Sequence, residues 1–120
     1  MSSYSEENVI TVAKGENLIY EGEDSNELYY IQTGTLAVLK RKSSGEQQIG
    51  TIYSGEIVGE MSFIDNEPRS ATVRALSDCI VIPIPREVFT RSQKSLPKWH
   101  AALLNTLIDR LRNANKKIKI

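Results

Sequence analysis

Glu60, Arg69 and Ser70 are the residues of this sequence whose chemistry points most directly to a ligand. All three lie in one segment, GEIVGEMSFIDNEPRSATVRA, which covers residues 55–75. Arg69 offers five N–H donors in a planar fork, and the Ser70 hydroxyl follows directly, so the pair can bind the oxygens of a phosphate. Glu60 would repel a phosphate, but its carboxylate can accept hydrogen bonds from hydroxyl groups. The segment therefore predicts a site for an anion that also carries hydroxyls.

Backbone groups extend this candidate site. The sequence Gly59-Glu60-Met61-Ser62-Phe63 follows an apolar pair typical of a strand and begins a short apolar turn. The first N–H groups of a helix have no intrahelical acceptor, and they attract phosphate. We therefore expect the start of this turn to face the same anion as Arg69.

The order of these residues resembles the phosphate-binding cassette of cyclic nucleotide-binding domains, as found in catabolite activators, kinase regulatory subunits and nucleotide-gated channels. The matching motifs are Gly-Glu-x-Ser at 59–62 and Pro-Arg-Ser-Ala-Thr-Val at 68–73. The resemblance implies that Glu60, with Gly59, binds the ribose and that Arg69 binds the cyclic phosphate. The residues that would complete the phosphate cradle are Gly59, Met61, Ser62 and Ser70.

Each of these residues also has an interpretation without a ligand. Arg69 could be an ordinary surface arginine, and Glu60 could simply stabilise the start of a helix through the dipole. Ser70 and Thr72 could be plain strand residues. The spacing of the two motifs favours the ligand roles of Arg69 and Ser70, allows both roles for Glu60, and leaves Thr72 open.

Short strands are expected to frame the cassette. The apolar runs VITV, NLIY, ELYYIQ, TLAVLKRK and QQIGTIY are rich in β-branched and aromatic residues, and glycines in polar clusters separate them. Tight turns are predicted at Thr33-Gly34 and Ser44-Gly45. Residues 70–75 and 79–84 are expected to form the two closing strands.

The composition after residue 84 changes to that of helices. Residues 86–95 have helical potential, Leu96-Pro97 interrupts the pattern, and a long amphipathic helix is predicted from Lys98 to about residue 116. Its apolar residues form two rows. One row contains Leu103, Leu107 and Leu111, and the other contains Leu104 and Ile108. We expect one row to close on the roll and the other to pair with a second copy of the chain.

This order of elements is similar to the cyclic nucleotide-binding architecture. The predicted fold is mainly β with C-terminal helices: a β-roll (double-stranded β-helix or jelly roll) with a cassette helix, then one short and one long helix. We predict the domain at residues 9–116, with the roll at about 9–84. A flexible tail at 1–8 would precede it, and a basic tail at 117–120 would follow.

The base of a nucleotide must be recognised outside the cassette, because the cassette binds only sugar and phosphate. The resemblance points to the late part of the long helix, where Arg110, Asn113 and Asn115 lie. An asparagine amide can match the donor and acceptor of an adenine edge, whereas Arg110 could stack on either base or bind the guanine carbonyl. Because no threonine follows Arg69, the resemblance to the family favours cyclic AMP over cyclic GMP.

Composition excludes several other classes of function. Fifteen acidic and fifteen basic residues give no overall attraction to nucleic acid or membrane. The single Cys79 lies in the apolar run CIVIPI, so we expect a buried thiol and a cytoplasmic protein. His100 is the only histidine, which leaves neither a multi-histidine metal site nor a catalytic triad. We therefore predict no enzyme activity, metal or other cofactor, and no membrane anchor.

The resulting hypothesis is a free-standing sensor that binds a cyclic nucleotide and reports it by moving its last helix. The sequence ends where relatives in the family would continue into a helix-turn-helix, so we expect no DNA-binding segment in this chain. The expected output is an unknown protein effector or a homodimer. The alternative is a degenerate β-roll that serves as an interaction or structural domain and binds no nucleotide. Intact Glu60, Arg69 and Ser70 argue against that alternative.

Overall fold

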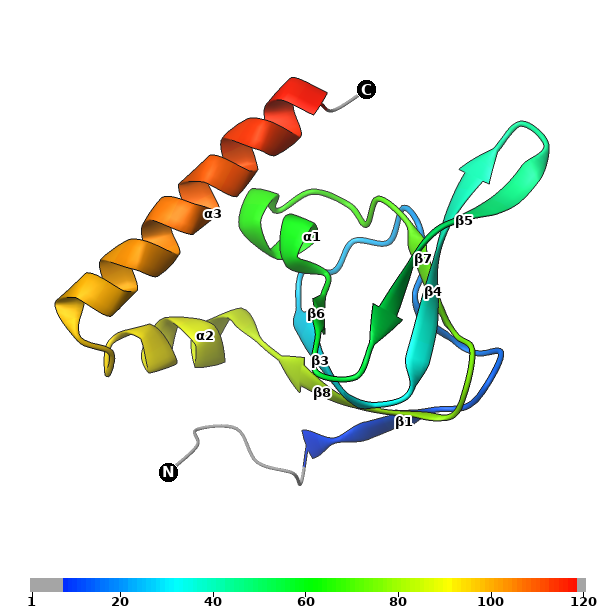
Figure 1. Cartoon of the computed structure of the whole chain (residues 1–120), viewed down its shortest axis with the longest axis horizontal. Coiled ribbons are helices and arrows are strands. Elements are labelled where there is room, and N and C mark those ends of the chain that lie inside the picture. Colours follow the sequence, from blue (N-terminus) through cyan, green and yellow to red (C-terminus); the bar gives the residue numbers. More distant parts are fainter. Residues whose placement is uncertain (1–7, 119–120) are drawn as a thin grey trace.

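The computed structural model describes residues 8–118, without the side chains of residues 115–118 (Figure 1). The strands are β1 (Ile10–Val12), β2 (Asn17–Ile19), β3 (Leu28–Thr33), β4 (Thr35–Lys42), β5 (Gly45–Tyr53), β6 (Ile57–Val58), β7 (Thr72–Ala75) and β8 (Cys79–Ile84). The helices are α1 (Glu60–Asp65), α2 (Arg86–Gln93) and α3 (Lys98–Ile118). The predicted tails lie almost wholly outside the described residues and stay predictions.

The strands form two antiparallel sheets, ordered β1-β8-β3-β6 and β2-β7-β4-β5. Apolar side chains from both sheets meet in one core, in which Ile31 and Val81 of the first sheet and Leu36 of the second are fully buried. Alternating apolar residues produce this arrangement, because each strand turns every second side chain inward. The structure confirms the predicted mainly β roll with C-terminal helices.

Two features of the chain confirm predictions about turns and the thiol. Gly34 joins β3 to β4 with a φ of 103°, and a Cβ atom there would lie 2.5 Å from the Cys79 sulfur. Glycine is therefore required both for its backbone conformation and for the close approach of β8. Cys79 is 2% exposed, as expected for a structural thiol.

The strand β7 begins two residues later than predicted, at Thr72 rather than Ser70. The reason lies in the backbone of Arg69, whose N–H donates to the carbonyl of Glu23 and whose carbonyl accepts from the N–H of Gly22. The backbone of Arg69 is thus hydrogen-bonded to the loop between β2 and β3 instead of to a strand. Pairing with β4 starts only at Thr72.

The helix α1 connects β6 to β7 and lies between the roll and α3 (Figure 1). Phe63 of α1 packs edge-to-face on Phe89 of α2, with ring centroids 5.0 Å apart. Arg112 of α3 donates to the carbonyl of Ile64 at 3.3 Å and pairs with Asp65 at 3.4 Å. Both C-terminal helices are therefore attached to the cassette helix.

The two rows predicted on α3 differ in burial. Leu104 and Ile108 are half-buried and lie on the same helix face as Arg112, so this row is directed toward α1 rather than toward the strands. The other row is between 40% and 70% exposed and consists of Trp99, Leu103, Leu107 and Leu111. Among the described residues, no helix is both long and apolar enough to cross a membrane.

Candidate anion-binding site

A cavity of about 180 Å³ lies between the cassette and the sheet β2-β7-β4-β5. Apolar side chains from the strands line one side, among them Val38, Ile52 and Val73. The cassette residues that line the cavity include all those predicted from the motifs: Gly59, Glu60, Met61, Ser62, Arg69 and Ser70. The fold thus brings the two motifs together, as their resemblance to a cassette implied.

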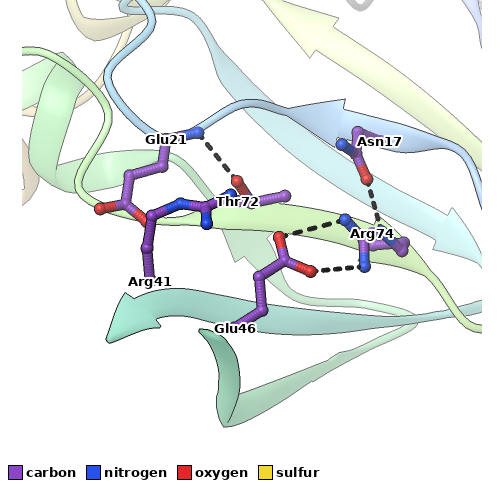
Figure 2. A network of polar contacts seen from close by, with 6 residues as sticks. All are labelled: Asn17, Glu21, Arg41, Glu46, Thr72 and Arg74. Atoms are coloured by element: carbon purple, nitrogen blue, oxygen red, sulfur yellow. Dashed lines mark hydrogen bonds and ion pairs between the residues drawn. The ribbon is translucent and has the colours of Figure 1, made fainter. Parts of the chain in front are cut away.

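A larger and more open hollow of about 660 Å³ lies beside β1 and β2. Its charged residues include Arg74, but Glu46 already binds this guanidinium through both carboxylate oxygens, at 2.9 and 3.2 Å (Figure 2). Asn17 accepts from the remaining Nε of Arg74 at 2.8 Å. The guanidinium in this hollow is therefore committed to holding strands together, and the cassette cavity is the better candidate for an anion site.

Arg69 is the central charged group of the cassette cavity and is only 3% exposed. Its Nε donates to the Ser25 hydroxyl at 3.0 Å, and its terminal nitrogens donate to the carbonyls of Gly59 at 3.2 Å and Glu27 at 2.8 Å. These bonds use three of the five N–H groups and leave one on each terminal nitrogen. Donors on these two neighbouring nitrogens can bind the oxygens of a carboxylate or phosphate.

No carboxylate of the described residues forms an ion pair with Arg69, although Lys40, Arg74 and Arg112 all have such partners. A buried charge without a counter-ion is costly, because the surrounding hydrogen bonds replace water but do not neutralise the charge. An anion in the cavity would supply the missing negative charge. The burial of Arg69 excludes its interpretation as an ordinary surface arginine.

Glu60 occupies the first turn of α1 and lines the same cavity. Burial raises the pKa of its carboxyl above the ordinary value, and the positive charge of Arg69 opposes this shift. Ionisation of the buried carboxylate is therefore costly unless further hydrogen-bond donors solvate it. Hydroxyl donors of a bound sugar would provide them.

The position of the Arg69 side chain requires a glycine at residue 59, even without a ligand. Gly59 has a φ of 92°, and a Cβ atom at this position would lie 2.6 Å from Nη1 of Arg69 and 3.0 Å from the carbonyl oxygen of Glu27. A side chain at residue 59 would thus displace the guanidinium. Glycine allows the carbonyl of residue 59 to accept from Arg69 instead.

The remaining predicted residues are divided between the cavity and the surface. Met61 and the buried Ser62 line the cavity, while Ser70 lines it from an exposed position. Arg110 and Asn113 of α3 are exposed and do not line it, and the side chain of Asn115 lies outside the described residues. The structure does not bring Arg110 or Asn113 to the cavity, so the base-contacting role of all three residues stays a prediction.

Sequence reasoning missed the groups that hold Arg69, namely the Ser25 hydroxyl and the carbonyl of Glu27. Tyr29 was also missed, although its ring centroid lies 5.7 Å from the guanidinium carbon. The segment EGEDSNE reads only as a polar turn. Backbone carbonyl acceptors in particular cannot be identified from the sequence, because every residue carries one.

The model of the family described as cyclic nucleotide-binding domain matches residues 9–94 of this chain. The chain belongs to the cyclic nucleotide-binding domain family. The match extends over both sheets and α2, and it includes every cassette residue that lines the cavity.

Curated relatives of this domain include two classes of regulator. The cAMP-dependent protein kinase regulatory subunit of Mycosarcoma maydis is 38% identical over 63 residues, which cover 52% of this chain and 12% of that protein. The cAMP-activated global transcriptional regulator CRP of Salmonella typhimurium is 32% identical over 103 residues, which cover 84% of this chain and 49% of that protein. The domain therefore spans half or less of these relatives.

Solved structures with the same domain show the likeness in three dimensions. The EAL enzyme Bd1971 in its halfsite-occupied form superposes with a TM-score of 0.83 and 30% identity, covering 89% of this chain and 96% of that one. A cyclic nucleotide-binding domain from Methylobacillus flagellatus has a TM-score of 0.70 and 30% identity, over 92% of this chain and 65% of that one.

Proposed function

We propose that this domain binds a cyclic nucleoside monophosphate in the cassette cavity and acts as a regulatory sensor rather than as an enzyme. The observation that carries the proposal is the buried guanidinium of Arg69, which has two N–H groups left over and no ion-pair partner among the described residues. A structural role alone would leave this charge without a direct ion pair, although the Glu60 carboxyl in the same cavity interacts with it electrostatically.

The cavity residues divide between phosphate and sugar. Arg69 binds the phosphate oxygens with its two remaining donors, and the backbone N–H groups of Met61 and Ser62 and the Ser70 hydroxyl complete the cradle. Glu60, with the backbone at Gly59, accepts from the ribose 2′-hydroxyl. The cavity of about 180 Å³ is smaller than the ~300–1,000 Å³ of typical small-ligand sites, so it would enclose sugar and phosphate and leave the base at its mouth.

Cyclic AMP is the favoured ligand, with cyclic GMP as the second candidate. The kinase regulatory subunit and the transcriptional regulator among the relatives are named for cAMP. Solved forms of the EAL enzyme Bd1971, at 28–29% identity, are described as cAMP-bound and as cGMP-bound. No other ligand is needed as a cofactor in this scheme.

The signal would pass from the cavity to α3 through α1. Glu60, Met61 and Ser62 in the first turn of α1 line the cavity, and the last turn of the same helix holds Arg112 of α3. A ligand that shifts the first turn therefore also shifts the anchor of α3. Movement of α3 would bring Arg110, Asn113 and Asn115 toward the base and would reposition its exposed apolar row.

The output of the sensor is a homodimer through the exposed row of α3, an unidentified protein effector, or both. The row from Trp99 to Leu111 offers a long apolar surface for a second copy of the chain. We place the protein in the cytoplasm, where a lone buried thiol such as Cys79 is common.

Thermal unfolding in the presence of nucleotides tests the proposal. A ligand that binds only the folded domain raises its stability in proportion to ln(1 + [L]/Kd). Cyclic AMP should raise the midpoint, cyclic GMP should raise it less, and linear 5′-AMP, which lacks the cyclic phosphate, should raise it least. Equal midpoints with and without either cyclic nucleotide at millimolar concentration would instead favour the degenerate, non-binding alternative.

A further inference from the structure

We propose that Glu21 and Lys40 are positioning residues for the phosphate site, acting through Arg69. The inference rests on the function proposed above and adds residues outside the cavity and outside both cassette motifs. Neither side chain lines the cavity. Their role follows from how the segment 69–72 is attached to the rest of the roll.

The loop between β2 and β3 holds Arg69 at both its backbone and its side chain. The N–H of Gly22 donates to the Arg69 carbonyl at 2.8 Å, and the Arg69 N–H donates to the Glu23 carbonyl at 2.9 Å. The same loop provides the Ser25 hydroxyl and the Glu27 carbonyl that fix the guanidinium. The direction of the two remaining N–H groups of Arg69 therefore depends on where this loop lies.

Glu21 anchors the loop to two strands. Its backbone N–H donates to the Thr72 hydroxyl of β7 at 2.9 Å (Figure 2), and its carboxylate accepts from the Arg41 N–H of β4 at 3.0 Å. The hydrogen bond from the Arg41 N–H, assisted by the charge of Lys40, holds the pKa of the Glu21 carboxyl below its ordinary value. Glu21 thus stays ionised at neutral pH and keeps both contacts with β4.

Lys40 closes the arrangement on the other side of Arg69. Its ammonium donates to the Ser70 carbonyl at 2.6 Å and lies 3.5 Å from the Glu21 carboxylate. The two side chains are 38% and 31% exposed, so their ion pair alone would contribute little to folding. Its importance is geometric: one ammonium joins the loop anchor to the peptide that directly follows Arg69.

The consequence is that the Arg69 peptide is held from both sides, by Gly22 and Glu23 on one side and by Lys40 on the other. Loss of either Glu21 or Lys40 would free the loop or the Ser70 peptide and let the guanidinium sample other directions. An anion-binding arginine that is less pre-organised binds more weakly, because ordering must occur on binding.

The test uses Lys40→Met, which keeps the aliphatic stem, Glu21→Gln, and Lys42→Met as a control on the exposed end of the same strand. Lys40→Met and Glu21→Gln should weaken cyclic AMP binding by roughly three- to tenfold, as expected for the net contribution of one typical hydrogen bond. Lys40→Arg should restore part of the affinity, and Lys42→Met should bind like the wild type.

Two readouts separate positioning from a general effect on the fold. In an Arg69→Ala background, Lys40→Met should cause no further loss of affinity, since its effect passes through Arg69. In the ligand-free wild type, the Arg69 Nε–H should exchange slowly with solvent by ¹⁵N NMR, and Lys40→Met should speed this exchange. An additive loss in the Arg69→Ala background, or unchanged Nε–H exchange, would overturn the proposal. If the wild type binds no cyclic nucleotide, the proposed function fails and the exchange measurement alone decides this inference.

Discussion

Arg69 is stable in a buried position because protein acceptors replace water around its guanidinium. Ser25, Gly59 and Glu27 each take one of its hydrogen bonds, but all three acceptors are neutral. Three of the five N–H groups are thereby satisfied, but no carboxylate among the described residues forms an ion pair with this guanidinium, whereas that of Arg74 is paired with Glu46. We therefore propose that an anion from outside the chain supplies the counter-charge.

The buried Glu60 carboxyl predicts how the free energy of unfolding depends on pH. Because burial raises the pKa of this carboxyl, the folded domain retains a proton that the unfolded chain releases in the window between the ordinary and the raised pKa. The free energy of unfolding should therefore fall as pH rises through this window. Glu60→Gln cannot ionise, so the stability of the variant relative to the wild type should increase across the window and then level off.

Urea unfolding of both proteins between about pH 4 and about pH 7 measures this difference directly, and other carboxyls such as Glu21 cancel in the comparison. A stability difference that stays constant over the series would show that the Glu60 carboxyl is not desolvated, and its assignment to the ribose would lose its physical basis.

Gly59 and Gly55 form a matched pair for testing the geometry around Arg69. Both have φ near 90°, but a Cβ atom at Gly59 would strike Arg69, whereas at Gly55 it would meet nothing within 4 Å. Each change to alanine should cost about 1–2 kcal/mol of stability from backbone strain. Only Gly59→Ala should also weaken cyclic AMP binding. Equal binding by the two variants in a competition assay would show that Arg69 need not lie where the structure places it.

Among the elements, α1 is the one that connects the cassette cavity to the C-terminal helices α2 and α3. Its first turn lines the cavity, and its last turn binds Arg112 of α3. α3 is thus attached near the end of the cassette helix that is farther from the ligand. This explains how Arg110 and Asn113 can be exposed here and still be candidates for base contact after α3 moves.

Replacing Arg110, Asn113 and Asn115 together by alanine tests the role of α3 as a lid. The triple variant should bring any preference for cyclic AMP over cyclic GMP toward unity, because the cassette itself contacts only sugar and phosphate. Affinity for both nucleotides should fall while phosphate-driven binding persists. A competition assay that returns the wild-type preference would place base recognition inside the roll, and Thr106→Ala serves as the neighbouring control.

Features that depend on neighbouring residues could be predicted from the sequence, whereas features that depend on tertiary contacts could not. The cassette motifs are local, so Glu60, Arg69 and Ser70 could be assigned to one site, and the period of apolar residues separated the two rows of α3. The support of Arg69 by the carbonyls of Gly59 and Glu27 could not be predicted, since every residue carries such an acceptor. The contact of α3 with α1 was also missed, because it depends on tertiary packing between segments distant in sequence.

At the scale of the whole molecule, α3 presents a long exposed apolar row that consists of Trp99, Leu103, Leu107 and Leu111. We expect this row to form a homodimer interface, and Leu107→Glu should yield a monomer by placing a charge in its centre. Leu107 is 52% exposed, so the fold of the monomer should tolerate the change. Thr90→Glu on α2 introduces the same charge elsewhere as a control. Sedimentation of the wild type as a monomer at high concentration, with and without cyclic AMP, would rule out the dimer.

Calorimetric titration with cyclic AMP, on the wild type and on Arg69→Ala in parallel, tests the central claim most directly. The wild type should bind one nucleotide per chain, and Arg69→Ala should lose roughly 2–5 kcal/mol of binding free energy, as is typical when one partner of a buried charge pair is removed. Arg91→Ala, which removes an exposed arginine of α2, should bind like the wild type. No heat from the wild type at millimolar cyclic AMP or cyclic GMP, or binding by Arg69→Ala within a few-fold of the wild type, would contradict the assignment of this cavity.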